Sequence, residues 1–241
     1  MLNETQRFYE LTRNAEVPSA GAEGSTPVTH TQIFYKEYPR FETIELPPAR
    51  NADARLDAAW NDRRSEREFG PATLSLSDVA SMLGSCRIVD DERETERRTY
   101  PSAGARFPIE LYLMAFRVDG LEPGCYHYKV RTNELEVLWP ADLESKTAEL
   151  VSPFVSNPAA AIVMTSVISR AEVKYGHKAY PFSYLEAGHM AQNMLLASAS
   201  RGIGTCPIGG FVDSTIVDLL DLTDDEIPVY VIAAGKRDRN P

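Results

Sequence analysis

A cluster of arginines is the part of this sequence that most clearly points to chemistry. Three of them fall within Arg63-Arg64-Ser65-Glu66-Arg67, and a second basic cluster, residues 235–239, lies near the end of the chain. A guanidinium group presents planar donors that bond two oxygens at once, and it keeps its charge, so it suits a phosphate or a delocalised oxyanion. The plainer alternative is a solvated helix end, where cations are favoured by the free carbonyl groups. The cluster alone leaves both interpretations open.

A short amphipathic helix must position this cluster. Leu56, Ala59 and Trp60 recur at helical spacing within residues 54–64, which predicts a helix that carries Arg63 and Arg64 at its end. The second cluster directly follows an apolar, branched run at residues 229–234, which predicts a final buried strand.

Other segments carry start, stop and periodicity signals of their own. Ser77 and Gly84 bracket a predicted helix over residues 78–83, and Ser183-Tyr-Leu-Glu186 predicts the capping box of a long helix that ends before Gly202. The remaining expectations are strands at 109–118 and 159–167, a hairpin of 125–130 and 134–138, a charged loop at 90–98, a loop at 205–210 and a short helix at 214–220. This irregular interleaving predicts a mixed α+β sheet rather than a doubly wound parallel one.

Composition narrows the class of protein. The chain has 241 residues, of which 43% are hydrophobic and 25% charged, and its net charge of −10 argues against nucleic acid as a partner. The three cysteines are widely spaced and odd in number, which favours a reducing compartment. No signal sequence or membrane-length apolar run is visible, so we expect a cytoplasmic protein without a membrane partner. No metal-ligand spacing occurs, and no metal is expected.

Several separated motifs resemble those of one enzyme family. The arginine cluster, a Pro-Ser-Ala-Gly turn at 101–104 and a Gly-Gly loop after the long helix are similar to those of the nitroreductase family of flavin enzymes. Residues 97–112, 124–128 and 186–193, together with Lys174-Tyr175, resemble the SagB-type dehydrogenases, which form thiazoles and oxazoles in peptide natural products. The likeness covers about residues 34–236. It implies a largely antiparallel sheet flanked by helices in an intertwined homodimer.

The resemblance also implies FMN as the cofactor, with two flavin sites shared between the subunits. The flavin-binding residues that it implies are Arg63, Arg64, Ser65, Arg67, Pro101, Ser102, Ala103, Gly104, Pro207, Ile208, Gly209, Gly210, Lys236 and Arg237. The arginines, Ser65, Lys236 and Arg237 would hold the phosphate and the N1–C2 edge of the ring, and residues 101–104 would reach the ring from the partner subunit. Residues 1–50 form an expected N-terminal arm with a flexible loop at 18–27, and residues 51–241 a single FMN-binding domain.

The same resemblance implies that Lys174 and Tyr175 are catalytic. Azoline oxidation removes a ring proton and a hydride, so it needs both a base and an acceptor. A lysine serves as a base only where burial or a nearby cation lowers its pKa, and the alternative is an exposed helical lysine beside a core tyrosine. Lys178 and Pro181 stand where family members commonly carry arginines, which leaves the class of substrate open.

Three functions follow as hypotheses. The first is an FMN-dependent azoline dehydrogenase that acts on a peptide or on a carrier-tethered substrate. The second is an NAD(P)H-dependent nitro- or quinone reductase. The third is a flavin-binding scaffold subunit of a biosynthetic complex.

Overall fold

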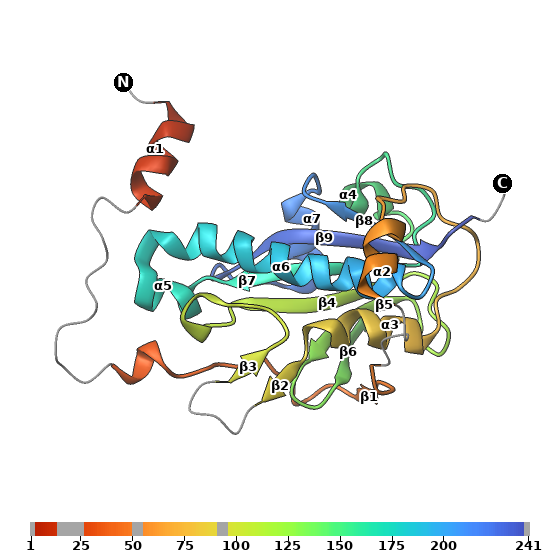
Figure 1. Ribbon diagram of the computed structural model, residues 1–241, viewed down its shortest axis with the longest axis horizontal. Coiled ribbons are helices and arrows are strands. Elements are labelled where there is room, and N and C mark those ends of the chain that lie inside the picture. Colours follow the sequence, from red (N-terminus) through yellow and green to blue (C-terminus); the bar gives the residue numbers. More distant parts are fainter. Residues whose placement is uncertain (1–2, 14–26, 50–54, 91–95, 239–241) are drawn as a thin grey trace.

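A seven-stranded sheet forms the centre of the computed structural model, which describes residues 3–13, 27–49, 55–90 and 96–238 (Figure 1). The strand order is β1-β6-β5-β4-β7-β9-β8, and every neighbouring pair is antiparallel. The strands are β1 (Thr43–Glu45), β4 (Ile109–Ala115), β5 (Gly124–Lys129), β6 (Glu134–Pro140), β7 (Ala160–Val167), β8 (Ile203–Ile208) and β9 (Glu226–Lys236). A separate ribbon pairs β2 (Ile88–Asp90) with β3 (Arg97–Arg98). The expected α+β class is confirmed.

Helices cover both faces of the sheet. The α-helices are α1 (Glu4–Thr12), α2 (Leu56–Asp62), α3 (Leu76–Leu83), α4 (Thr147–Val151), α5 (Ser169–Tyr175), α6 (Ala179–Ala199) and α7 (Asp213–Leu220). Short 3₁₀ helices occur at η1 (Val28–His30), η2 (Gly84–Cys86), η3 (Ala103–Ala105) and η4 (Gly176–Lys178). In Figure 1, α6 runs along the sheet with α5 at one end and α2 at the other.

Two apolar cores lie on the two sides of the sheet, and β7 shows how one strand serves both. Ala160, Ile162 and Met164 pack into the core that contains α3 and α6. Ala161 and Val163 point the other way, into the core that contains α4 and α7. All five residues are at most 1% exposed, as expected for a continuous apolar run buried on both faces.

The predicted hairpin and the four predicted helices are confirmed, with shifted boundaries. The hairpin of β5 and β6 turns at residues 130–133. Helix α2 is shorter than the predicted 54–64 and ends at Asp62, so Arg63 is its C-cap and Arg64 follows it. Helix α3 begins earlier than predicted, because Ser75, and not Ser77, forms the capping box with Asp78. The two candidate caps differ by two residues, and only the side-chain geometry distinguishes them.

Two local predictions are wrong. The capping box at Ser183–Glu186 does not exist, since α6 begins four residues earlier and the Ser183 hydroxyl donates to the Ala179 carbonyl within the helix. The segment 205–210 is not a loop throughout, because β8 extends to Ile208 and pairs with β9. Pairing with β9 overrides the turn preference of Pro207, whereas Gly209 and Gly210 follow the strand as predicted for a loop.

The predicted charged loop at 90–98 has strand residues at both of its ends. Asp90, Arg97 and Arg98 belong to the β2–β3 ribbon, and Glu96 is buried beneath it; residues 91–95 lie outside the described residues. The expected flexible loop at 18–27 also lies almost wholly outside them. Across the described ranges, no helix combines the length and the apolar character needed to cross a bilayer.

Candidate active site

The arginine cluster forms an extended edge beside β8. Arg63 caps the C-terminal end of α2, and the chain then turns to run parallel to β8, where Ser65 bridges Thr205. The Glu66 amide donates to the Thr205 carbonyl at 2.8 Å. The structure thus brings the predicted segments 63–67 and 205–210 together.

The three arginines of this cluster differ in whether they form ion pairs. Arg64 forms an ion pair with Glu66 at 2.9 Å. Arg63 and Arg67 have no acidic partner in the part of the chain that the structure describes, and the Arg67 guanidinium lies 5.8 Å from the centre of the Phe154 ring. Two guanidinium groups are therefore free to bind an anion, which is what a phosphate site requires.

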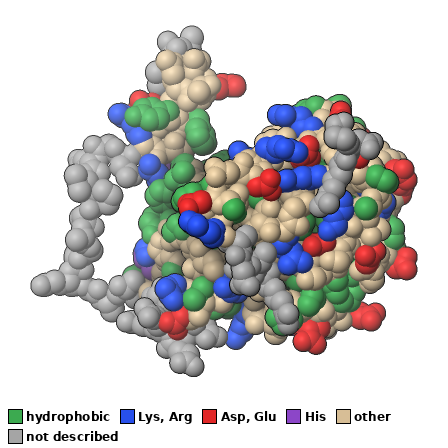
Figure 2. Space-filling model, turned by 45° about the vertical axis from the view of Figure 1, so that its right-hand side comes forward, with side chains coloured by type: hydrophobic (Ala, Val, Ile, Leu, Met, Phe, Trp, Pro, Cys, Tyr) green, Lys and Arg blue, Asp and Glu red, His purple; other side chains and the backbone are tan. Residues whose placement is uncertain are grey.

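Lys236 and Arg237 lie on the same edge, at the end of β9, but acidic residues already engage them. Lys236 Nζ bonds Asp78 Oδ2 at 2.7 Å, and Arg237 bonds Asp62 at 2.9 Å. Figure 2, turned to bring this end of the molecule forward, shows basic and acidic side chains mixed on the same face. The ion pairs with Asp62 and Glu66 place Arg237 beside the arginine cluster, whereas Lys236 is paired with Asp78 of α3.

The glycine pair that follows β8 leaves its backbone accessible. A Cβ built on Gly209 would meet no atom within 4 Å, so the space beside it is open. The Gly210 carbonyl accepts a hydrogen bond of 2.5 Å from Ser152. Of the two preceding predicted residues, Pro207 is half-buried, whereas Ile208 points into the core and is 1% exposed. Ile208 can therefore contribute only its backbone to a ligand.

The second predicted ligand-binding segment, residues 101–104, opens a loop that continues to Phe107 and has unusual backbone conformations. Gly104 has a φ of +57°, and the non-glycine residues Ala105 and Phe107 have φ of +52° and +46°. Such conformations are rare for a bulky residue and cost about 1–3 kcal/mol each, so surrounding contacts must hold the loop. Strain of this kind is typical of functional sites.

Four contacts fix Phe107. Its amide donates to Ser102 Oγ at 2.9 Å, and its carbonyl accepts from the Arg170 guanidinium at 3.1 Å. Its ring lies 4.1 Å from the Arg98 guanidinium and edge-to-face with Tyr100. These contacts offset the strain and hold residues 101–107 in one conformation.

The predicted catalytic pair meets this loop. Lys174 and Tyr175 end α5, both half-buried, and a Cβ built on Gly104 would lie 2.8 Å from Lys174 Nζ and closer still to the Tyr175 phenol oxygen. Only a glycine leaves room for both side chains at this point. One chain therefore brings together the proposed base and the residues expected to reach the flavin ring.

Sequence reasoning missed Arg106, which packs beside the pair. Its side chain is 1% exposed, its Nε donates to the Arg170 carbonyl at 2.7 Å, and both terminal nitrogens lack a partner within the described residues. Burial lowers the pKa of Arg106, while the nearby Tyr175 phenol favours the charged form. The burial of Arg106 was not predicted, because arginine is rarely buried and the pattern of the strand that follows does not indicate it.

A buried ionic network beneath α5 was also not predicted. His127 lies between Glu136 at 2.7 Å and Glu110 at 3.1 Å, and Arg170 pairs with Glu110 at 2.6 Å. Burial acts to lower the pKa of His127, but the two carboxylates outweigh it and raise that pKa. Burial likewise opposes ionisation of Glu110, yet His127 and Arg170 hold its pKa at about 2. The network ties α5 to the sheet.

The arginine cluster at 63–67 and the strained loop at 101–107 lie toward opposite ends of β9. Ser166 pairs with Ile109, which follows the strained loop, and with Ile227 at the start of β9. Lys236 ends β9, nine residues further on, and pairs with Ile203. At about 3.3 Å per residue, Ile227 and Lys236 are about 30 Å apart along β9. Figure 1 shows the same arrangement, with α5 and α2 at the two ends of α6.

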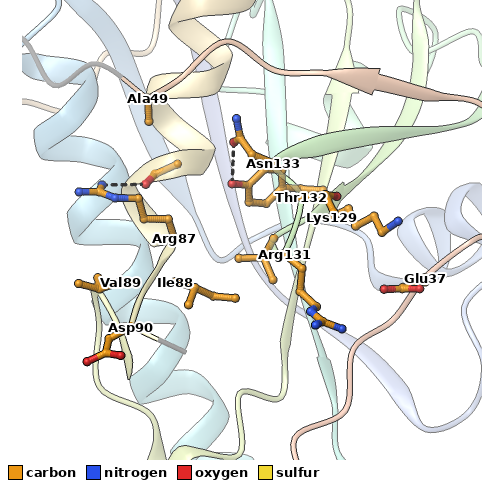
Figure 3. Close-up of a pocket in the computed structure, with 13 residues that line it drawn as sticks. Glu37, Ala49, Arg87, Ile88, Val89, Asp90, Lys129, Arg131, Thr132 and Asn133 are labelled. Carbon is orange, nitrogen blue, oxygen red and sulfur yellow. Dashed lines mark hydrogen bonds between the residues drawn. The ribbon is translucent and has the colours of Figure 1, made fainter. Parts of the chain in front are cut away.

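A cavity of about 550 Å³ lies elsewhere, between β2 and the β5–β6 hairpin (Figure 3). Its lining includes Arg87, Lys129 and Arg131, but none of the predicted site residues. These cations are engaged nearby: Arg87 donates to the Gly84 carbonyl at 3.1 Å, and Arg131 lies over the ring of Tyr35. The cavity is separate from the candidate site.

The mostly antiparallel sheet flanked by helices defines a nitroreductase-like fold. The nitroreductase family profile matches residues 61–236, and the chain belongs to this family, whose members are oxidoreductases that typically bind flavin. A similar solved structure is a protein from Ralstonia eutropha described as a nitroreductase, with a TM-score of 0.72, 26% identity, and coverage of 82% of this chain and 90% of that one.

Three further relatives refine the comparison. MJ1384 of Methanocaldococcus jannaschii, described as a nitroreductase, is 28% identical over 81% of this chain and 98% of its own length. The microcin B17-processing protein McbC of Escherichia coli is 27% identical over 66% of this chain and 61% of its own length. The E. coli McbBCD microcin synthetase, solved with truncated pro-MccB17 bound, has a TM-score of 0.66 at 22% identity and covers 96% of this chain and 86% of the matched chain. The resemblance inferred from the motifs is confirmed.

Proposed function

We propose that this protein is an FMN-dependent dehydrogenase that oxidises thiazoline and oxazoline rings to thiazoles and oxazoles in a peptide natural product. The observation that carries the proposal is the convergence of Lys174 and Tyr175 on Gly104, beside the strained loop that contains Ser102. The similarity to McbC and to the trifolitoxin-processing protein TfxB of Rhizobium leguminosarum, which is 29% identical over 63% of this chain and 44% of its own length, supports a peptide substrate. A carrier-tethered substrate fits the same chemistry.

Lys174 and Tyr175 act on the proton that leaves the azoline ring. The amine receives the proton, and the phenol orients or relays it, because both groups reach the same point above Gly104. The positive charge of Arg106 stabilises negative charge that develops on the Tyr175 oxygen. The ionic network beneath α5 and the contacts of Phe107 hold Lys174, Tyr175 and Arg106 in fixed positions relative to one another.

The residues at the two ends of the sheet fit an FMN molecule. Among the described residues, Arg63 and Arg67 have no acidic partner, so their guanidinium groups can bind its phosphate and the N1–C2 edge. The open backbone at Gly209 lets a flat ring approach. Ser102 and its neighbours would meet the ring. Once bound, FMN supplies the acceptor for the hydride.

The proposed flavin site is shared by two subunits. Within one chain, the arginine cluster lies level with the Lys236 end of β9 and the strained loop lies level with the Ile227 end. These two ends are about 30 Å apart, which exceeds the length of one FMN molecule. A second copy must therefore supply one of the two groups. Exposed apolar side chains along α2 and α6, such as Trp60 (55%) and Leu185 (59%), offer a surface for that copy. Assembly with further subunits, as in McbBCD, is part of the proposal.

The test is turnover of a thiazoline-containing peptide by the FMN-loaded protein. We expect the peptide to lose the mass of two hydrogen atoms, and Lys174→Ala and Tyr175→Phe to slow the loss by about 10²–10⁴-fold while FMN remains bound. Lys146→Ala, at an exposed lysine on the α4 side, serves as the control. Full turnover by both site variants would refute the assigned roles, and no mass loss by the wild type would refute the reaction.

A reductase that uses NAD(P)H is the second candidate. The similarity to MJ1384, which this chain covers over 98% of that protein's length, favours it. Rapid bleaching of the bound flavin by NADPH, without any oxidation of the thiazoline peptide, would establish this function instead.

A further inference from the structure

Glu186 is a buried carboxyl group with a single hydrogen-bond partner. It lies on α6, is 2% exposed, and its Oε2 is 2.5 Å from Ser102 Oγ. Its Oε1 is buried and has no partner among the described residues. A carboxylate in this position would be poorly solvated, because ionised carboxyl groups in a protein interior need several donors or a cation.

The nearest cations are committed to other groups. Arg98 bonds Glu96 at 2.6 Å and the Tyr100 hydroxyl at 3.0 Å. Arg170 bonds Glu110 and the Phe107 carbonyl. Neither guanidinium is hydrogen-bonded to Glu186, although both are close enough to act on it through their charge.

These surroundings keep Glu186 neutral. Burial raises its pKa to about 8, and the Ser102 hydrogen bond and the charges of Arg98 and Arg170 only partly oppose this. The other titratable groups that face it do not change charge in this range, because burial raises the pKa of Cys86 to about 12 and that of Tyr100 above its usual range.

The protonation state of Glu186 decides which way the Ser102 hydroxyl can donate. A hydroxyl has one donor and two acceptor positions. The Phe107 amide occupies one acceptor position at 2.9 Å. An ionised Glu186 accepts the single Ser102 hydrogen. A neutral Glu186 can instead donate its own hydrogen into the other acceptor position, which frees the Ser102 hydrogen for a different acceptor.

We propose that Glu186 is a positioning residue that, in its protonated form, turns the Ser102 hydroxyl into a donor toward the bound flavin. This inference rests on the proposed function, since it requires FMN to bind against the Ser102 loop. A ligand acceptor gains a hydrogen bond while Glu186 is neutral and loses it when Glu186 ionises. By linkage, FMN binding and proton binding at Glu186 strengthen each other by the same factor.

The experiment measures the dissociation constant of FMN for the full chain at about pH 7 and about pH 9, on either side of this pKa. For the wild type we expect binding to weaken by about fivefold at the higher pH, and by about tenfold, the value of one hydrogen bond, once Glu186 is fully ionised. In Glu186→Gln the amide always donates to Ser102, so binding should stay tight at both pH values. The FMN phosphate, with a second pKa of about 6, does not titrate across this range.

Proton uptake gives a second measurement that needs no variant. Near pH 8 the wild type should take up a fraction of a proton as FMN binds, detected by calorimetry in buffers of different ionisation enthalpy, whereas Glu186→Gln should take up none. Equal pH dependence in the two proteins, or no proton uptake by the wild type, would overturn the role of Glu186. Failure of every protein to bind FMN would instead refute the proposed function.

Discussion

Gly104→Ala tests whether the room above the strained loop sets the geometry of the catalytic pair. The new Cβ would lie 2.8 Å from Lys174 Nζ, whereas ordinary contact begins at 3.4 Å, so the amine must move by at least the difference of 0.6 Å. The Tyr175 phenol, which is closer, must move further. A displacement of about 1 Å at reacting groups costs about 10²-fold in rate, so we expect azoline oxidation to fall by about that factor.

Gly120→Ala is the matched control. Gly120 also has a positive φ, at +83°, but a Cβ there would meet nothing within 4 Å. Each substitution forces an alanine into the left-handed region and should lower the free energy of unfolding by about 1–2 kcal/mol. Rates come from single-turnover oxidation of a thiazoline peptide, and flavin content from visible absorbance. If Gly104→Ala oxidised the peptide as fast as Gly120→Ala, the pair would not act at this point.

Three further outcomes are expected. Arg63→Gln and Arg67→Gln should each weaken FMN binding by about 10–100-fold, which is the value of hydrogen bonds to a charged group. The free energy of unfolding should not change. Unchanged affinity in fluorescence titrations would exclude a phosphate site at these arginines. His127→Gln should lower the free energy of unfolding by about 3–5 kcal/mol at about pH 6. The folded-state pKa of His127 is raised above its usual 6.5, so the loss of stability should shrink as the pH rises through that folded-state pKa. Chemical denaturation that shows the same loss at every pH would contradict this prediction. Leu185→Glu should make the protein monomeric in light scattering, whereas the control Val89→Glu on β2 should leave it dimeric. A dimeric Leu185→Glu protein would show that α6 is not part of the interface.

The sequence predicted those elements whose signals are local and strong. The run that became β7 and the hairpin of β5 and β6 were identified because a buried strand and a two-strand turn each have their own pattern. The start of α6 was misplaced because Ser183 and Glu186 match a capping box by spacing alone. Strand β8 was missed because it owes its conformation to pairing with β9, a contact that its own residues do not encode.

The candidate site shows the same division between local and tertiary information. Motif resemblance identified Lys174 and Tyr175, and the structure brings them to Gly104. The motif resemblance could not identify Arg106 or Glu186, because these residues are important for being buried with too few hydrogen-bond partners among the described residues. Such properties depend on what packs around a side chain, and they are visible only once distant segments are placed together.

Subunit complementation tests the shared site directly. If Arg67 of one chain and Tyr175 of the other serve the same flavin, Arg67→Gln and Tyr175→Phe each disable both sites of their own homodimer. A mixed dimer carries both defects in one site and leaves the other intact, so random mixing should restore about one quarter of wild-type turnover, half of the dimers being mixed and each having one good site. Sites built within single chains would show no such gain, because every site would then contain one of the two defects. Mixing with the double variant Arg67→Gln/Tyr175→Phe is the control, since no combination that contains it and either single variant can form an intact shared site. Arg67 and Tyr175 lie toward opposite ends of β9, which are about 30 Å apart, and this is the reason to expect recovery. No recovery in mixed dimers verified by mass spectrometry would refute the shared site.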